Sequence, residues 1–257
     1  MRNCETWKET KFVLKSGSLL SSSDPMEVSV GSRLMANLIA ANYLPALKSY
    51  ASGRLLDLGC GKAPLYGAYK DLVTEITCVD WGNSLHQTDY LDKEADLTRP
   101  LEFPDAAFDT IILSDVLEHI PVPLDLCREI ARLLSPGGKL IMNVPFYYPL
   151  HEVPHDFYRY TEFALRRFME ISEMRIIYLQ PFGGALEIIS DIVSKNIMKL
   201  PIVGRLAAGA LQRISWWFVN SGVGARLSKK TSSQFPLGYF MVAERNGGPL
   251  ADALPRS

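Results

Sequence analysis

The sequence of 257 residues lacks a charge excess of either sign: 27 Lys and Arg residues are balanced by 28 Asp and Glu residues. Proteins that bind nucleic acid normally carry a basic surplus, so no nucleic-acid partner is expected. Only four cysteines occur, without a C-x-x-C pair or a neighbouring His at metal-ligand spacing. A zinc site and a disulfide framework are therefore not expected, and reduced thiols are typical of a cytoplasmic protein.

Long hydrophobic runs are also missing. Residues 1–17 have no apolar segment typical of a secretory signal, and no stretch reaches about 18 uncharged apolar residues. We therefore expect neither a signal peptide nor a transmembrane helix, and a cytoplasmic location. A composition of 47% hydrophobic and 21% charged residues is typical of a globular chain.

The chain instead shows strands alternating with amphipathic helices. Apolar runs predict strands at residues 54–59, 75–80, 95–97 (weak), 110–115, 139–145, 175–181 and 239–245. Helical periodicity predicts helices at residues 32–50, 123–134 and 161–172, and two more that are split near Pro201. This alternation predicts an α/β fold with a doubly wound, mostly parallel seven-stranded sheet, helices on both faces and a helical insertion before the last strand.

The order of these elements divides the chain into four parts. Residues 1–50 are expected to form an arm, loose to about residue 30, and a helix. Residues 51–184 form the core, and residues 185–236 the helical insertion. Residues 237–257 hold the last strand and a frayed tail.

One strand runs into a glycine turn in the sequence LLDLGCG. Gly59 and Gly61 allow a sharp turn and the close approach of a ligand. Asp80 ends the next strand, where a carboxylate can accept both hydroxyls of a ribose. Pro64 replaces the third glycine of the dinucleotide fingerprint, and Asp57 before the turn would repel a phosphate and attract a cation. The pattern therefore favours a positively charged nucleoside over NAD.

Five motifs in order carry a family resemblance: LLDLGCG, VD after the second strand, ADL, FPDAAFDTIILSDVLEHI and LSPGGKL. Together they resemble the class I S-adenosylmethionine-dependent methyltransferases, and more narrowly the type-11 methyltransferase domain, over about residues 55–245. The resemblance implies a Rossmann-like fold and makes residues 51–184 the cofactor-binding core. It also implies S-adenosyl-L-methionine as cofactor and S-adenosyl-L-homocysteine as product.

The resemblance implies roles for the residues of the glycine turn. Asp57, Gly59 and Gly61 would cradle the methionine part of the cofactor, with Cys60 supplying backbone atoms. Asp80 would bind the ribose hydroxyls. The alternative is that the glycines only form a tight turn and that Cys60 is a small packing residue.

Further roles implied by the resemblance concern the adenine. Trp81 would lie against the ring, Asp96 would accept a hydrogen bond from the amino group, and Leu97 would offer its backbone. Ser114 and Asp115 would close the strand beside the cofactor. The helix expected before Asp96 is short or missing, so Asp96 could instead be a surface or N-cap residue.

The densest polar cluster is FYYPLHEVPHDFYRYT, which follows the strand at 139–145. Its prolines predict a loop, and loops at this edge can carry acceptor binding and catalysis. Because His titrates near neutral pH, His151 is the predicted base and His155 the second candidate. The predicted acceptor contacts are Tyr148, Arg159 and Tyr160. No metal is expected, because no His, Asp and Glu set shows ligand spacing on two facing elements.

This loop also has a structural interpretation. His155, Asp156, Arg159 and Tyr160 could form a hydrogen-bonded clamp that only shapes it. The LEHI segment after the 110–115 strand is similarly interpreted as a structural helix start. The N-terminal arm, with Trp7, Lys11 and Phe12, could fold over the same mouth.

The acceptor and the partners are less defined. The loop is loosely similar to that of methyltransferases of glycan and surface-polysaccharide assembly, which favours a hydroxyl oxygen of a small-molecule or glycan-like acceptor. Residues 185–220 are apolar, with four Lys and Arg against two acids and with Trp216, Trp217 and Phe218 together. This segment could be a lid, a homodimer face, or a peripheral contact with the inner face of a membrane that serves a lipid or quinone acceptor. A non-catalytic module that binds the cofactor is the remaining alternative.

Overall fold

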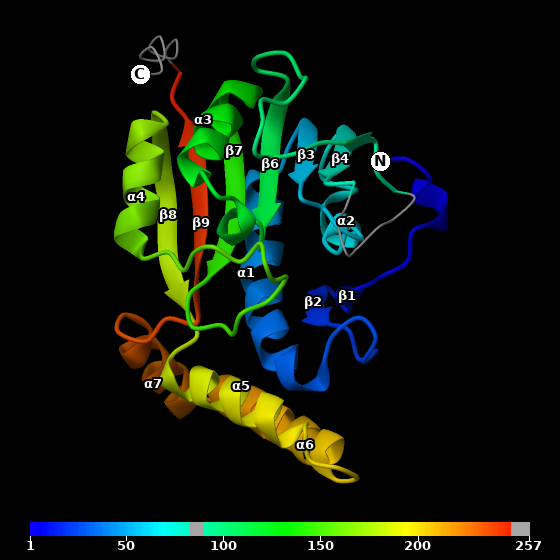
Figure 1. Cartoon of the computed structure of the whole chain (residues 1–257), viewed down its shortest axis with the longest axis vertical. Helices are drawn as coiled ribbons and strands as arrows, with labels where there is room; N and C mark the ends of the chain where they lie inside the picture. Colours follow the sequence, from blue (N-terminus) through cyan, green and yellow to red (C-terminus); the bar gives the residue numbers. More distant parts are fainter. Residues whose placement is uncertain (83–89, 248–257) are drawn as a thin grey trace.

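A seven-stranded sheet forms the centre of the computed structural model, which describes residues 1–82 and 90–247 (Figure 1). The strand order is β5-β4-β3-β6-β7-β9-β8. These strands are β3 (Arg54–Leu58), β4 (Glu75–Asp80), β5 (Lys93–Glu94), β6 (Phe108–Ser114), β7 (Leu134–Pro145), β8 (Met174–Phe182) and β9 (Gly238–Arg245). β9 runs antiparallel to both neighbours, whereas the other pairs are parallel. The predicted mostly parallel α/β sheet is confirmed.

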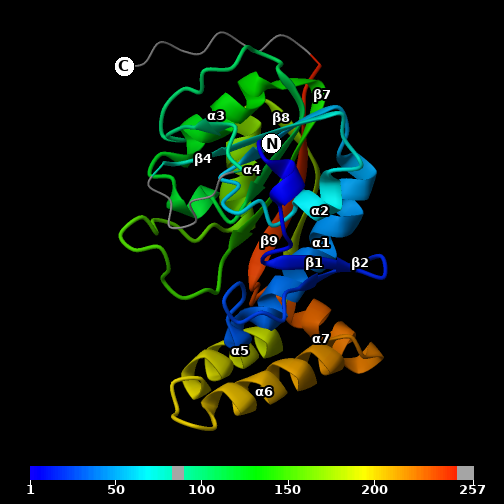
Figure 2. The ribbon, with the colours of Figure 1, turned by 90° about the vertical axis from the view of Figure 1, so that its right-hand side faces the viewer.

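Helices cover both faces of the sheet (Figures 1 and 2). The α-helices are α1 (Arg33–Tyr50), α2 (Tyr66–Tyr69), α3 (Pro123–Leu133), α4 (Glu162–Ile171), α5 (Ala185–Ile197), α6 (Gly204–Val219) and α7 (Gly222–Ser232). Short 3-10 turns are η1 (Cys4–Thr6), η2 (Val30–Ser32) and η3 (Leu117–His119). No helix of the described residues combines the length and the apolar character needed to cross a membrane.

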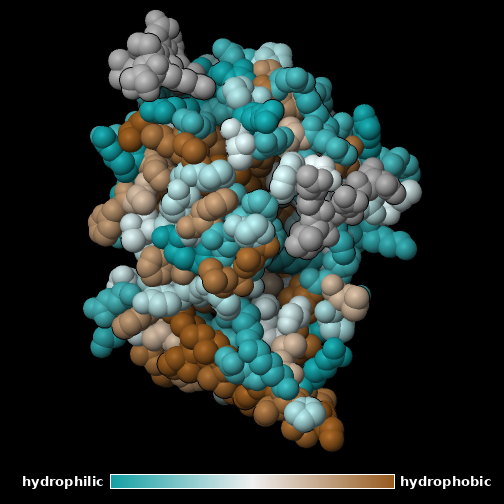
Figure 3. Space-filling model, viewed as in Figure 1, coloured by the Kyte–Doolittle hydropathy of each residue, from teal (hydrophilic) through white to brown (hydrophobic). Residues whose placement is uncertain are grey.

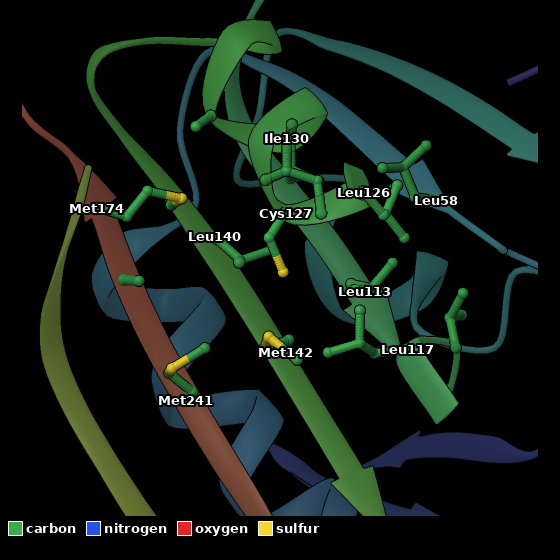
Figure 4. Close-up of a cluster of buried hydrophobic side chains, with 14 of the residues drawn as sticks. Leu58, Leu113, Leu117, Leu126, Cys127, Ile130, Leu140, Met142, Met174 and Met241 are labelled. Atoms are coloured by element: carbon green, nitrogen blue, oxygen red, sulfur yellow. The ribbon is translucent and has the colours of Figure 1, made fainter. Parts of the chain in front are cut away.

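Two apolar layers hold the helices to the sheet, because side chains alternate along each strand. Leu56 and Leu58 of β3 pack toward α3, together with residues of β6 and β7 (Figure 4). Leu55 points to the opposite face, where Tyr43 of α1 is completely buried. This continuous burial explains why the strands are apolar along their whole length.

The order of the strands reverses between β3 and β6, which both leave the sheet at its carboxyl edge. Ligands of doubly wound sheets bind outside this edge, at such a switch point. Three segments lie near the same edge: the N-terminal hairpin, the loop after β7 and the helices α5 to α7 (Figures 1 and 2). The fold therefore surrounds one place with segments that are distant in sequence.

The N-terminal arm differs from the prediction, because it is not loose. It forms a hairpin of β1 (Phe12–Lys15) and β2 (Ser18–Ser21), and the side chain of Phe12 is 1% exposed. The amino group of Met1 forms an ion pair with Asp92 at 3.0 Å. The Ser-rich composition hid these strands, since they gain stability from packing on α1 rather than from a run of apolar residues.

Other differences are local. The helix after the glycine turn, α2, has only four residues, and the weak strand lies at 93–94 instead of 95–97. β7 begins at Leu134, so the SPGG sequence lies within the strand. The insertion contains a third helix, α7, which was not predicted. The tail predicted to fray lies mostly at 248–257, outside the described residues.

The insertion is joined to the N-terminal end of α1. Gln212 of α6 is buried; its side chain accepts a hydrogen bond from the Leu34 backbone N–H at 2.6 Å and donates one to Ser194 at 2.9 Å. A buried amide that satisfies groups on two other elements fixes their relative positions. The helices α5 and α6 are therefore anchored below the carboxyl edge of the sheet.

Candidate active site

The glycine turn leaves no room for larger residues. Gly59 and Gly61 have φ angles of 69° and 51°, which favour glycine. A Cβ atom on Gly59 would lie 2.5 Å from Cγ2 of Val116. The turn after β3 therefore packs against the segment that follows β6. We call these two segments together the cradle.

Asp80 fixes the backbone of this turn from the neighbouring strand. Its Oδ2 accepts a hydrogen bond from the Gly61 N–H at 2.7 Å, and its Oδ1 accepts one from the Trp81 N–H at 2.7 Å. Cys60 is buried, and a hydrogen bond with Cys78 together with burial raises the pKa of its thiol. The thiol is therefore a packing group, because a reactive cysteine needs a lowered pKa.

Asp57 lies below the turn and is 3% exposed. The hydroxyl of Tyr69 donates a hydrogen bond to its Oδ2 at 2.8 Å. Burial raises the pKa of Asp57 to about 7, with Tyr69 opposing and the charge of Asp80 reinforcing the rise. A buried carboxylate in this position is stabilised by any cation that binds beside it.

The end of β6 is held by Asn143, which is 1% exposed and was not predicted. Its Oδ1 accepts hydrogen bonds from Tyr43 at 2.8 Å and from Ser114 at 3.0 Å, and its Nδ2 donates to Asp115. Asp115 also accepts a hydrogen bond from the Lys11 ammonium at 2.8 Å. Burial lowers the pKa of Lys11, but Asp115, with smaller contributions from Tyr148 and Glu118, raises it above its ordinary value, so Lys11 stays charged.

The three residues that the family resemblance assigns to the adenine differ in their contacts and in their exposure. Asp96 accepts hydrogen bonds from the backbone N–H and the hydroxyl of Thr98, at 2.9 and 2.7 Å, so it caps a turn. Leu97 is buried beside it. The Trp81 ring is 40% exposed and makes an edge contact with the His155 ring at 5.4 Å. These bonds stabilise a turn at residues 96–99, and the contact of Asp96 with an adenine stays a prediction.

A clamp shapes the loop after β7. The guanidinium of Arg159 donates two hydrogen bonds to the Asp156 carboxylate, at 2.6 and 2.7 Å, and the rest to the carbonyls of Tyr148, Pro149 and Tyr158. These bonds hold the pKa of Asp156 well below its usual range. All five N–H donors are used, which favours a structural role for Arg159 over acceptor binding.

Tyr160 has a similar structural position. It is 4% exposed, and its hydroxyl donates to the Leu117 carbonyl at 2.9 Å. Tyr148, in contrast, lies at the mouth of the site. Its ring faces the ammonium of Lys195 at 3.9 Å and makes an edge contact with His151 at 5.1 Å. Of the predicted acceptor contacts, Tyr148 therefore has the favourable position.

His151 lies at the centre of a polar cluster and is itself partly exposed. Its Nδ1 is 3.3 Å from Asp156 Oδ2, and its Nε2 is 3.7 Å from Glu118 Oε1. Burial lowers the pKa of His151, but Glu118 and Asp156 raise it by more. His155 is exposed, and its ring lies against Trp81 and Phe157 instead.

Glu118 and His119 complete the cluster. Their side chains approach within 3.8 Å, and the carboxylate of Glu118 is fully buried. The sequence motif LEHI contains both residues, but its pattern indicates only the start of a helix. The signal that could have identified them is the pair itself, since an acid inside an apolar motif is rarely buried without a function.

Comparison with known proteins agrees with the architecture. The sequence model of a family described as "Methyltransferase domain" matches residues 32–176, more than half of the chain. The fold also resembles solved structures: the [4+2]-cyclase SpnF (TM-score 0.53, 17% identity, 83% of this chain and 82% of that chain) and an S-adenosylmethionine-dependent methyltransferase from Mesorhizobium loti (0.52, 16%, 80% and 97%). These likenesses show the fold, and the expected class I methyltransferase architecture is confirmed.

Curated relatives match a shorter part of the chain. Ubiquinone biosynthesis O-methyltransferase from Xanthomonas oryzae pv. oryzae (strain PXO99A) is 29% identical over 117 residues, 42% of this chain and 49% of that protein. The protein of the same name from Xanthomonas euvesicatoria pv. vesicatoria (strain 85-10) is 32% identical over 120 residues, with equal coverage. The chain thus spans about half the length of the curated relatives it matches.

Proposed function

Since the chain belongs to the methyltransferase-domain family and uses S-adenosylmethionine, we propose that it transfers the methyl group to a hydroxyl oxygen of a small-molecule acceptor. The observation that carries the proposal is the meeting of two groups at the carboxyl edge: the glycine cradle after β3 and the His151 cluster after β7. One group binds the methyl donor, and the other prepares the acceptor.

The cradle fits the cofactor in shape and in charge. Gly59 packs against Val116 so closely that a Cβ would not fit, and its φ angle of 69° shapes a turn whose backbone a ligand can approach. Asp57 supplies a negative charge for the cationic donor, and Asp80 has a carboxylate at the end of β4 for the ribose hydroxyls. Trp81 offers a partly exposed ring to the adenine. Ser114 and Asp115 close the edge at β6.

The acceptor end supplies a base that removes the proton of the acceptor hydroxyl. The lone pair of the acceptor oxygen attacks the methyl carbon as the carbon–sulfur bond breaks and its electrons go to sulfur. Alignment of the two reactants supplies most of the rate, and a placed base adds about 10²–10⁴-fold. His151 is the proposed base, because Asp156 orients its ring and Glu118 stabilises its charge. The relatives named as ubiquinone biosynthesis O-methyltransferases support oxygen as the methylated atom.

Thermal unfolding with added ligands tests the cofactor part. At about 100 times its dissociation constant, S-adenosylmethionine or S-adenosylhomocysteine should add roughly 2.7 kcal/mol of stability. For a chain of this size the expected shift is about 5–10 °C, absent with NAD and strongly reduced in Asp80→Ala. A shift with NAD alone, or no shift with either adenosyl ligand, would contradict the proposal.

A second candidate concerns where the acceptor resides. Residues 192–243 contain seven Lys and Arg residues and no Asp or Glu. The same segment exposes large apolar side chains, which include Ile202 at 98%, Leu206 at 78% and Trp217 at 74%. Figure 3 shows the resulting apolar surface at the lower end of the molecule, where α5 and α6 lie. Such a basic, apolar surface favours peripheral contact with an anionic membrane and a lipid-like or quinone-like acceptor over a free glycan.

A further inference from the structure

We propose that Glu118, His119 and His151 bind a divalent transition-metal cation at the acceptor end of the site. One ligand atom from each residue lies within 4.8 Å of the other two. Glu118 Oε1 lies 3.7 Å from His151 Nε2, and the closest contact of its carboxylate with His119 Nε2 is 3.8 Å. Two ligands bound at about 2.1 Å to one metal are roughly 3.0–3.4 Å apart. Small side-chain rotations would therefore bring all three onto one cation.

Among the described residues, the carboxylate of Glu118 accepts no hydrogen bond, and its nearest charged neighbours are the two histidines. Its side chain is 0% exposed, and neither oxygen is within hydrogen-bond distance of a donor there. The backbone carbonyl of Glu118, in contrast, accepts hydrogen bonds from Phe157 and Tyr158 and so fixes the residue in place. A buried carboxylate without a donor is costly, and a bound cation removes that cost.

Both histidines face this carboxylate with Nε2. Nδ1 of His119 lies 2.9 Å from the His155 carbonyl, which can only accept, so this nitrogen carries the proton in the neutral ring. Its Nε2 is then unprotonated, is buried and contacts no hydrogen-bond donor among the described residues. His151 is oriented in the same way by the Asp156 carboxylate at 3.3 Å. Metal-binding histidines are held by such partners on the opposite ring nitrogen.

The ligand set selects the class of metal. Two imidazoles and one carboxylate suit Zn²⁺, Mn²⁺ or Fe²⁺, whereas Mg²⁺ prefers an all-oxygen shell. Glu152 Oε2 lies 3.9 Å from His119 Nε2, on the exposed side of the cluster, and could add an oxygen ligand. The remaining positions on the cation would be open to the acceptor.

The inference rests on the proposed function for the role of the cation. A hydroxyl bound to the metal has a lowered pKa, so its proton leaves to water and the oxygen becomes the nucleophile for the methyl carbon. The nitrogen of His151 that would act as the base is then a ligand, and the cation activates the hydroxyl in its place. Two further charged groups lie near Glu118: the ammonium of Lys11 and the carboxylate of Asp115.

Metal binding by the full chain tests the inference without any assay of activity. The protein is freed of metal with a chelator, and Zn²⁺, Mn²⁺ and Mg²⁺ are titrated in a calorimeter. We expect one Zn²⁺ or Mn²⁺ per chain with much weaker Mg²⁺ binding. Co²⁺ should give visible absorption bands of a site with nitrogen ligands.

Variants locate the bound ion. Glu118→Gln and His119→Ala should weaken binding by more than the 10–100-fold expected for loss of an outer partner, and Asp156→Asn by about 10–100-fold. His155→Ala is the matched control with unchanged affinity, because only its carbonyl contacts His119. Glu118→Gln removes a buried charge, so its melting temperature should not fall, which separates lost binding from unfolding.

The outcomes separate this inference from the proposed function. Absence of stoichiometric binding, or equal affinity in Glu118→Gln, overturns the metal site while leaving the shift with S-adenosylmethionine intact. Binding that is lost in Glu118→Gln and His119→Ala but kept in His155→Ala supports the site even if the adenosyl ligands give no shift.

Discussion

The ammonium of Lys11 lies 2.8 Å from Oδ2 of Asp115, across 104 positions of sequence. This ion pair joins the N-terminal hairpin to the end of β6, where Asn143 also binds Asp115. The indole N–H of Trp7 extends the attachment by donating to the Ala63 carbonyl at 3.2 Å, next to the glycine turn. The arm is therefore a wall of the site, in contact with both halves of the cradle.

Removing this ion pair should weaken the attachment of the N-terminal hairpin to the site without unfolding the sheet. Lys11→Ala leaves a partly buried Asp115 carboxylate without its cation, at a cost of about 1 kcal/mol in the free energy of unfolding, since the pair is partly exposed. We expect about tenfold weaker binding of S-adenosylhomocysteine, measured by calorimetry. Lys15→Ala, on the exposed face of the same hairpin, is the control; an equal loss in both variants would contradict the prediction.

Asp57 should make stability decrease as pH rises. Its folded pKa is about 7 against an ordinary value of 3.8, so its contribution is complete below pH 4 and is lost as pH rises through 7. Asp57→Asn keeps a hydrogen-bond acceptor for Tyr69 without the buried charge. At pH 8 we expect a gain of about 1–3 kcal/mol for the protein without cofactor, together with weaker binding of S-adenosylmethionine.

Urea unfolding of wild type and Asp57→Asn between pH 4 and 8 measures this difference. The two curves should meet near pH 4 and separate as the pH rises. Parallel curves would show that the carboxyl of Asp57 titrates normally, and the proposed burial effect would then be wrong.

The clamp between Asp156 and Arg159 should matter for turnover rather than for cofactor binding. Asp156→Asn weakens the two charge-assisted bonds to Arg159 and releases the ring of His151. We expect kcat to fall by about 10–100-fold while the dissociation constant of S-adenosylhomocysteine stays within twofold.

Asp125→Asn provides a matched control for the clamp, because Asp125 and Arg128 form an ion pair of the same spacing on the exposed face of α3. Exposed pairs contribute little, so this variant should keep wild-type kcat. If Asp156→Asn weakened cofactor binding, the clamp between Asp156 and Arg159 would support the cofactor site, and the prediction would be wrong.

The sheet and the cradle were predictable because their signals are local. Strands buried on both faces need unbroken apolar runs, and the positive φ angles at Gly59 and Gly61 require residues without a side chain. The helix predicted from residue 161 is also local, because the side chain of Thr161 caps α4 by accepting a hydrogen bond from the Ala164 N–H at 3.3 Å. Each of these features depends on neighbours within a few positions.

The acceptor end was less predictable because its contacts join distant segments. The spacing of Glu118, His119 and His151 along the chain shows no ligand pattern, since the loop after β7 brings His151 back to η3. The sequence also could not show that every donor of Arg159 is used within the loop. Polar residues in one loop look equivalent in sequence, and only their partners separate the clamp from the reactive group.

The insertion should bind anionic membranes through its apolar stripe. Leu206 and Trp217 lie eleven positions apart on α6, which places them on one face of the helix, and Ile202 precedes it. Arg213 lies on the same face and Arg205 lies beside it, and each basic residue near an anionic surface adds about 1 kcal/mol. Binding should therefore require both negative lipid and exposed apolar side chains.

Co-sedimentation with vesicles tests this surface. Wild type should bind vesicles that contain phosphatidylglycerol, bind weakly to pure phosphatidylcholine, and dissociate as salt is raised, because the Debye length shortens. The triple variant Ile202→Ser, Leu206→Ser, Trp217→Ser should lose at least tenfold in affinity. Phe163→Ser is the control, since Phe163 is 73% exposed on α4, away from the insertion. If the triple variant bound as well as wild type, the stripe would instead be a surface for another copy of the chain, and its removal should then change the sedimentation coefficient.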